Sequence, residues 1–515
     1  MSNQTLEAPT PVQVPAPSPL PRTGMRRATS ILELAATPWI LSAIALLVLS
    51  LLVVLWARAR PGYDPYGWLV WGKLSVHLKL DTNGAPSWKP LPFVFTVPYA
   101  LFGRFSLWLW MVTSVAISLS GPVFAWRIAF RLTDAPPQRR YAAYTAGLFA
   151  ALCVLGLQDV VGHLTYAHYV LSAESDTMIV ALCLAAIDCH LTGRHRVAFW
   201  IWWLASLGRP EVWPFAVLAA VWLWRSIPAY RPWLIAGLVA QLFFWFGIPA
   251  LTSKSAFTAG NIAQNSPREV HGNKIAGTLS RFHAIEANTV WVAAALAVAV
   301  AAARRNWTVL ALAAGALLWL VIEVAFALGG FPSVPRYMFE AGAVAATLGG
   351  VFVGWLILAL PPFLAGAVAR LGAAELGPQM SRKVGAWGTG LVLVAIAGSM
   401  FGPAHNAYRL ERADLVHERQ RTVLIERLST VVERLGAANI LACGTPNIPI
   451  AYQSVLAWYV DVKIGELYVS QQHERSHPRP LVNIYPIRSL GWKVFPSHLQ
   501  AASVGRCAAL RLVYR

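Results

Sequence analysis

The chain has 515 residues, of which 57% are hydrophobic and only 13% are charged. A soluble domain is closer to half apolar and a quarter charged, so this composition excludes an ordinary soluble protein. Apolar runs of about 20 residues recur, each long enough to cross the roughly 30 Å hydrocarbon layer of a bilayer. The net charge of +19 does not indicate nucleic-acid binding, because the sequence carries no such motif and basic residues hold the cytoplasmic loops of membrane proteins in place.

Residues 1–38 form a Pro-rich polar tail that we expect to be disordered and cytoplasmic. The run 39–57 follows, and "ARA" at 57–59 is similar to a signal-peptidase site. Because the run is long and Pro61 lies close behind it, we interpret 39–57 as an uncleaved first span.

The remaining apolar runs predict a polytopic, mainly α protein with about eleven helices. We place spans near 107–126, 141–161, 174–191, 232–251, 286–303, 307–328, 337–360 and 386–402, and two shorter helices broken by "GRPEVWP" between 197 and 225. With the N-terminus in the cytoplasm, every predicted cytoplasmic loop carries at least two basic residues, as the positive-inside rule requires. The predicted outer loops 58–106 and 252–286 also carry several cations, which indicates an anionic ligand at the outer face.

The chain becomes polar after residue 403. Residues 404–436 predict an amphipathic helix, and the short apolar runs that follow predict a small extracytoplasmic α/β domain over 404–515, beside a membrane domain over 39–403. Cys443 and Cys507 both lie in this domain, so we predict a disulfide between them, with two buried free thiols as the alternative. The three other cysteines lie in predicted spans as packing residues.

Ionisable residues converge on the predicted outer face. They are Asp64 after the first span, Lys89 in "WKPLP", Glu174 and Asp176 in "ESD", Arg209 and Glu211 in "GRPE", Arg336 with Tyr337 in "PRYMF", Glu340 one turn further, and His163 and His168 in a short loop. Ionisable groups inside membrane spans predict a functional site by default, and the convergence of acids and bases on one face strengthens that prediction.

The order of these motifs resembles the C-type glycosyltransferase superfamily, in its branch of protein O-mannosyltransferases and lipid A aminoarabinose transferases. The resemblance covers roughly 39–402, and it rests on Asp64, "WKPLP", "ESD" and "PRYMF" in that order. It departs from the family in "YDPY", which lacks a second acid, and in the single proline before the leucine of "KPL". The stretches "DPYGWLVWGK" and "LDTNGAPSW" suggest an actinobacterial branch.

The resemblance implies a transferase at the outer face of the plasma membrane, which takes a sugar from a polyprenyl-phosphate donor. The acceptor is expected to be a cell-envelope glycan, lipid or protein. Asp64 is then the general base, because a hydroxyl nucleophile must lose its proton. Lys89 and Arg336, with Tyr337, hold the phosphate leaving group. Glu174 or Asp176 orients hydroxyls or helps to hold a divalent cation, although the sequence defines no metal site and no certain cofactor.

Each residue also has a structural alternative. Asp64 before a proline is typical of a turn, Lys89 and Arg336 of interfacial anchors, and Glu174 and Asp176 of acids in the first turn of a helix. Arg209 and Glu211 are expected to pair within the broken hairpin, whereas His163 and His168 have no matching metal-ligand set in the sequence. At the level of the whole chain, the alternatives are a transporter or flippase of a lipid-linked sugar and a non-catalytic assembly protein.

Overall fold

The computed structural model describes residues 24–84, 86, 88–264, 266–370, 378–469, 480–497, 507 and 510–514. The main helices of the membrane part are α1 (Gly24–Ala57), α4 (Ser106–Thr133), α5 (Arg140–Leu155), α7 (Ser175–Leu191), α8 (His195–Ser206), α9 (Trp213–Ser226), α10 (Arg231–Leu242), α14 (Asn288–Arg304), α15 (Trp307–Leu328), α16 (Phe339–Arg370) and α17 (Pro378–Leu435). A π-helical turn, Phe243–Gly247, continues α10 into the short α11 (Ile248–Thr252). Shorter helices lie in the connections: α2 (Tyr63–Val76), α3 (Pro90–Ala100), α6 (Tyr166–Leu171), α12 (Thr258–Gln264) and α13 (Lys274–His283).

In the described part of the chain, six helices are long and apolar enough to cross a bilayer, or seven if α13 and α14, bent by 97°, form one span. The several apolar helices agree with a polytopic membrane protein. Helices α5, α7, α8 and α9 each have fewer than 18 residues, so they are too short to be counted among these spans. The span expected over 141–161 ends already at Leu155. Gly156 follows it, and the chain then forms a small antiparallel pair, β1 (Gln158–Asp159) with β2 (Leu164–Thr165).

The expected break between two short helices is present between α8 and α9. Arg209 is extended and Pro210 begins a 3₁₀ turn, so the helical hydrogen bonds stop at this point. The carbonyl oxygen of Ser206, freed by the break, accepts hydrogen bonds from the side chains of Trp213 (3.1 Å), Gln241 (3.1 Å) and Trp245 (3.0 Å). Irregular backbone is tolerated at membrane depth when protein groups satisfy it in this way.

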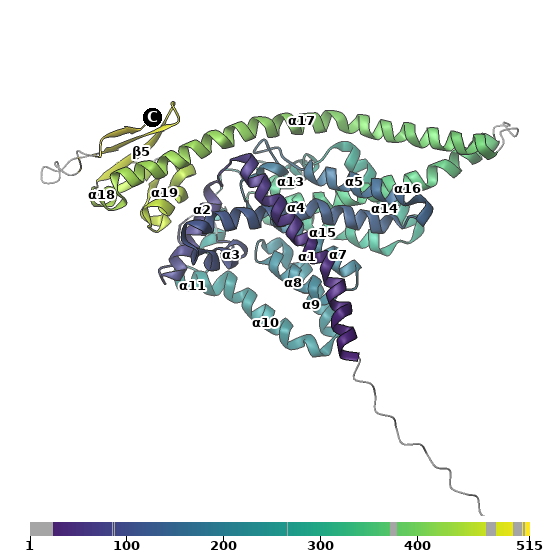
Figure 1. Cartoon of the computed structure of the whole chain (residues 1–515), viewed down its shortest axis with the longest axis horizontal. Helices are drawn as coiled ribbons and strands as arrows, with labels where there is room; N and C mark the ends of the chain where they lie inside the picture. The colour runs from purple at the N-terminus through teal and green to yellow at the C-terminus, as the bar shows by residue number, and fades with distance from the viewer. Residues whose placement is uncertain are drawn as a thin grey trace, which may run out of the picture.

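Helix α17 is continuous from the membrane part into the C-terminal unit, and in Figure 1 it runs along one side of the bundle as a single curved rod. The expected domain boundary at 403/404 therefore lies inside a helix, which passes through Pro403 without a break. The C-terminal unit adds α18 (Ala437–Ala442), α19 (Gln453–Val460) and a sheet. Its strands are β3 (Thr445–Ile448), β4 (Tyr468–Val469), β5 (Leu481–Ile487), β6 (Gly491–Pro496) and β7 (Leu512–Tyr514).

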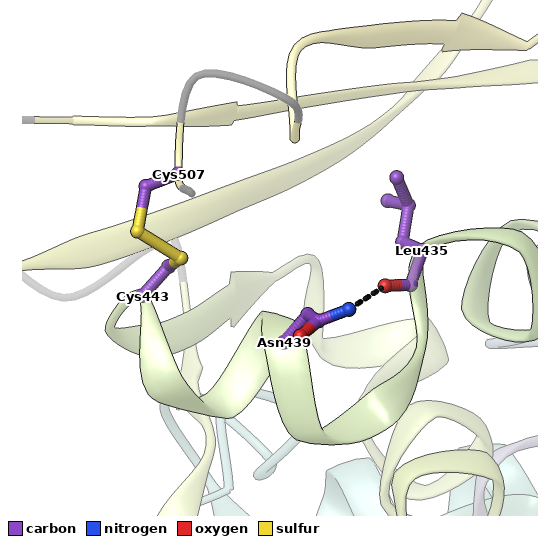
Figure 2. The surroundings of a disulfide bond; sticks show 4 residues. All are labelled: Leu435, Asn439, Cys443 and Cys507. Carbon is purple, nitrogen blue, oxygen red and sulfur yellow. Dashed lines mark hydrogen bonds between the residues drawn. A yellow bond between two sulfur atoms is a disulfide. The ribbon is translucent and has the colours of Figure 1, made fainter. Parts of the chain in front are cut away.

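The sheet has the order β4-β3-β5-β6-β7, with parallel pairs on both sides of β3 and antiparallel pairs from β5 onward. The predicted disulfide between Cys443 and Cys507 is confirmed, and Figure 2 shows it at the C-terminal end of α18. The side chain of Asn439 on α18 donates a hydrogen bond to the carbonyl oxygen of Leu435, the last residue of α17 (2.9 Å). Cys153, Cys183 and Cys189 are free and buried, as expected for packing residues.

The C-terminal unit packs directly on α2. The amide of Arg60 donates to the hydroxyl of Thr422 on α17 (2.7 Å), and the hydroxyl of Tyr63 donates to the side chain of Gln453 on α19 (3.2 Å). Lys73, at the other end of α2, forms an ion pair with Asp461 (2.8 Å). The helix that begins beside Asp64 is therefore held from both ends by residues near the C-terminus.

Candidate functional site

Five elements distant in sequence bring their charged residues together. Asp64 lies in the first turn of α2, and Lys89 is the residue before α3. Glu174 and Asp176 begin α7, and Arg209 lies in the break between α8 and α9. The fifth element is the 3₁₀ turn Pro335–Met338, which carries Arg336 and leads into α16.

Asp176 is the centre of this charged cluster. Its carboxylate is 1% exposed and forms an ion pair with Arg209, which is also buried. Lys89 Nζ lies 4.0 Å from Oδ2 of Asp176, and Arg336 Nε lies 3.8 Å from Oδ1. A buried carboxylate is strongly destabilising unless cations and hydrogen bonds compensate it, so Asp176 fixes the positions of all three cations.

The surroundings of Asp64 differ from those of Asp176. It is half-buried, and none of the described residues forms a hydrogen bond or a close ion pair with its carboxylate. Burial raises the pKa of Asp64 above its ordinary value, and the nearby positive charges of Lys89 and Arg336 only partly oppose this effect. An unpaired carboxylate with a raised pKa can accept a proton from a substrate.

Lys89 and Arg336 retain positive charge that Asp176 does not neutralise. Lys89 Nζ also donates to the hydroxyl of Ser175 (3.2 Å) and lies 5.7 Å from the ring centroid of Trp68. The guanidinium of Arg336 lies between two rings, 5.5 Å from that of Tyr169 and 5.6 Å from that of Tyr337. Aromatic faces attract cations weakly, so both residues are positioned without being fully paired.

Tyr337 separates two guanidinium groups. Arg209 lies 3.9 Å from its ring centroid, on which Arg336 also packs. Its backbone carbonyl accepts a hydrogen bond from the indole of Trp319 (2.9 Å), which fixes the start of α16. The geometry thus makes Tyr337 a spacer between two cations.

A second set of carboxylates surrounds Arg209 on its other side. Glu211 Oε1 lies 3.8 Å from Nη1 of Arg209, so the expected pair in the hairpin is present, and Glu340 Oε1 lies 3.9 Å from Nε. Glu323 on α15 is 1% exposed and close enough to interact with Glu211 and Glu340. The sequence prediction missed Glu323, although an acid inside the apolar run 307–328 was a signal for it.

Two further residues belong to the site. Ser175 accepts the hydrogen bond of Lys89 described above, and Arg268 contributes positive charge near Asp64. Arg268 is one of the cations of the predicted outer loop 252–286 and Ser175 lies within "ESD", but neither residue was assigned a role of its own from the sequence. Only the packing of the loop after α12 and of the start of α7 brings them to the charged cluster.

His163 and His168 do not join the charged cluster. His163 is exposed with a φ of 54°, in the left-handed region. His168 lies on α6 and contacts Asp414 of α17, with 2.7 Å between Nδ1 and Oδ2. In the described part of the chain, no three possible metal ligands lie together around Asp176.

An apolar groove of about 630 Å³ reaches Glu340, whose Oε1 lies 3.9 Å from Nε of Arg209 in the charged cluster. Helices α7, α8, α9, α15 and α16 line it, from His190, Leu191 and Trp307 at one end to Trp319 and Glu340 at the other. It combines a long apolar wall with a charged end, as an amphiphilic ligand requires.

No protein-family profile matches the sequence, and no curated protein matches it. Two solved structures are similar to the chain, those of ArnT from Cupriavidus metallidurans in the apo state and bound to undecaprenyl phosphate. Both are 15% identical and cover 88% of this chain and 94% of their own, with TM-scores of 0.44 and 0.43. At this identity and TM-score they do not identify the chemistry of this chain, and they do not bear on an actinobacterial origin.

Proposed function

We propose that the protein transfers a sugar from a polyprenyl-phosphate donor to a cell-envelope glycan, lipid or protein at the outer face of the plasma membrane. The observation that supports this best is the unpaired carboxylate of Asp64 beside two incompletely neutralised cations, Lys89 and Arg336. The order of motifs in the sequence led to the same residues. The proposal assumes that the C-terminal unit lies outside, and the basic residues of the short loops support that topology.

In the proposed reaction, an acceptor hydroxyl oxygen forms a bond to the anomeric carbon of the sugar. The bond between that carbon and the phosphate oxygen breaks, and polyprenyl phosphate leaves with the electron pair. Asp64 takes the hydroxyl proton as the attack develops. General base catalysis of this kind typically increases the rate about 10²–10⁴-fold. Lys89 and Arg336 stabilise the charge on the leaving phosphate.

The other residues of the cluster have supporting roles in this proposal. Asp176 holds the three cations, which is a role distinct from proton transfer because its carboxylate is already paired. Glu174 has a buried oxygen, Oε2, without a hydrogen-bond partner in the described structure, so it is suited to bind a sugar or acceptor hydroxyl. The apolar groove that ends at Glu340 receives part of the polyprenyl tail.

The test uses purified protein in nanodiscs with a panel of labelled polyprenyl-phosphate sugars and membrane extract. We expect transfer of one sugar by the wild type and its loss in Asp64→Asn. Asp134→Asn is the matched control, because Asp134 is exposed at the end of α4, twenty residues after Ser114, which contacts the backbone of Glu174. Transfer at the wild-type rate by Asp64→Asn would contradict the proposed base, and failure of every donor to bind would contradict the proposed function.

A transporter of a lipid-linked sugar is the second candidate. The observation that favours it is the pair Glu323 and Glu340, 1% and 3% exposed, which lie within helices α15 and α16 beside the broken hairpin. Buried acids next to broken helices mark transport pathways in many membrane proteins. Uptake of a labelled lipid-linked sugar into vesicles without any transfer product would support this candidate over the first.

A further inference from the structure

A second group of ionisable residues lies where α6 meets α17, outside the charged cluster. It consists of His168 on α6 and of Asp414 and Glu418 on α17. One ligand atom from each lies within 4.8 Å of the others, and the His168 Nδ1 to Asp414 Oδ2 distance is 2.7 Å. Asp414 and Glu418 are four residues apart, so they project from the same face of one helix.

Local contacts fix the histidine in this position. Thr165 caps α6, since its hydroxyl oxygen accepts a hydrogen bond from the amide of His168 (3.2 Å). The same hydroxyl donates to the carboxylate of Glu411, which lies one turn before Asp414 on α17. The hydrogen bonds of Thr165 and the group of His168, Asp414 and Glu418 therefore connect the same two helices, α6 and α17. His168 already faces the carboxylates.

The charges in this group do not balance. Glu418 is 3% exposed and His168 is 9% exposed, and the buried Oε1 of Glu411 has no hydrogen-bond partner among the described residues. Arg421 forms an ion pair with Glu418 and His168 with Asp414, whereas Glu411 accepts the hydrogen bond of Thr165 and has no ion pair among the described residues. Buried carboxylates in excess of cations are costly, and a dication would compensate them.

We propose that His168, Asp414 and Glu418 form a binding site for a divalent transition metal of the zinc type. One imidazole and two carboxylates match the donor atoms that Zn²⁺ takes, with water in the fourth position, whereas Mg²⁺ prefers oxygen alone. Two ligands four residues apart on a helix and a third from another element are a recurrent layout for such sites. Arg421 orients the Glu418 carboxylate from outside the ligand set, as outer partners of metal ligands commonly do.

The metal would join α6 to α17. Tyr169, the residue after His168, packs against Arg336 of the charged cluster, and α17 carries the C-terminal unit. The site would therefore tie that unit to the loop 159–174, which leads into Glu174. This role is structural, and it does not depend on the proposed transfer reaction.

The test measures Zn²⁺ binding by chelator-treated, tag-free protein in nanodiscs, by calorimetry and by metal content after dialysis. We expect about one tightly bound Zn²⁺ per chain in the wild type. Loss of a residue that only orients a metal ligand typically weakens metal binding 10–100-fold. His168→Ala and the isosteric Asp414→Asn each remove a ligand itself, so each should lower the Zn²⁺ affinity by at least that factor. His163→Asn is the control, because His163 is exposed and lies outside the ligand set.

A second readout separates binding from folding. Zn²⁺ should raise the Tm of the wild type and of His163→Asn, because a ligand of the folded state stabilises it, and at the same Zn²⁺ concentration it should raise that of Asp414→Asn less. The histidine pair His190 and His195, with ring nitrogens 3.1 Å apart, is the competing site. Binding that is lost in His190→Ala but retained in His168→Ala would overturn the proposal, and so would absence of stoichiometric binding in the wild type.

Discussion

Lys89 Nζ lies 4.0 Å from the Asp176 carboxylate, although the two residues begin different helices, α3 and α7. The same nitrogen donates to Ser175, the neighbour of Asp176, so two contacts hold the ammonium at the start of α7. Because a distance of 4.0 Å leaves the ion pair incomplete, the ammonium can bind an additional anion. This geometry supports the proposal that Lys89 binds the donor phosphate.

We expect Lys89→Ala to lower kcat/KM for the lipid donor by about 10–100-fold, because a hydrogen bond to a charged group contributes about 1.5–3 kcal/mol. Lys89→Arg keeps the charge and should recover part of the loss. Steady-state kinetics with the donor in nanodiscs would measure both. Lys79→Ala, on the loop after α2, is the control, and an equal loss there would indicate a nonspecific effect of charge.

The rate of transfer should fall on acidification at a higher pH than for an ordinary aspartate. Burial raises the pKa of Asp64, so its proton is retained to a higher pH, and a base must be deprotonated to act. The acidic limb of the kcat/KM profile should therefore lie above the usual Asp pKa of about 3.9. It should persist in Asp64→Glu and disappear in the residual activity of Asp64→Asn. An unchanged limb in Asp64→Asn would assign it to another group.

Removal of one partner of the buried ion pair should destabilise the protein more than removal of both. Arg209→Met leaves Asp176 buried without its closest cation, which typically costs about 3–5 kcal/mol in the free energy of unfolding. The double variant Arg209→Met, Asp176→Asn should recover part of this loss, and thermal unfolding of all four proteins in a double-mutant cycle would measure it. Additive losses would show that the two side chains are not coupled.

Gly72→Ala should separate α2 from α3. A Cβ at residue 72 would lie 2.4 Å from the backbone oxygen of Thr96, which cannot move without shifting α3. We expect a loss of about 1–3 kcal/mol in stability, as for other overpacked sites, and reduced transfer because Asp64 lies on α2 and Lys89 directly precedes α3. Gly465→Ala, with open space around it, is the control and should behave as wild type.

Much of the membrane part could be predicted from the sequence, because apolar runs of span length have a single physical explanation. The break at Arg209 was recognised from the proline of "GRPE", and the disulfide between Cys443 and Cys507 from their common place in the C-terminal domain. Prolines interrupt helical hydrogen bonds within a few residues, so such breaks are visible without tertiary information.

The partners of the charged residues were less predictable. The sequence grouped Asp176 with the catalytic acids, and nothing local showed that Arg209, thirty-three positions later, would pair with it. Contacts of His168 with α17 span 246 positions and depend on how the long helix packs against the bundle. Ion pairs of this kind follow from tertiary packing, which residue types and spacing do not encode.

The unbroken course of α17 has a mechanical consequence. A helix of 58 residues extends for roughly 87 Å at 1.5 Å per residue, and this one is continuous from the membrane part into the C-terminal unit. Thr422 contacts Arg60 just before α2, and Gln453 and Asp461 contact the two ends of α2, so that unit is attached to the segment that carries Asp64. A displacement of the C-terminal unit would therefore also displace the helix that carries Asp64.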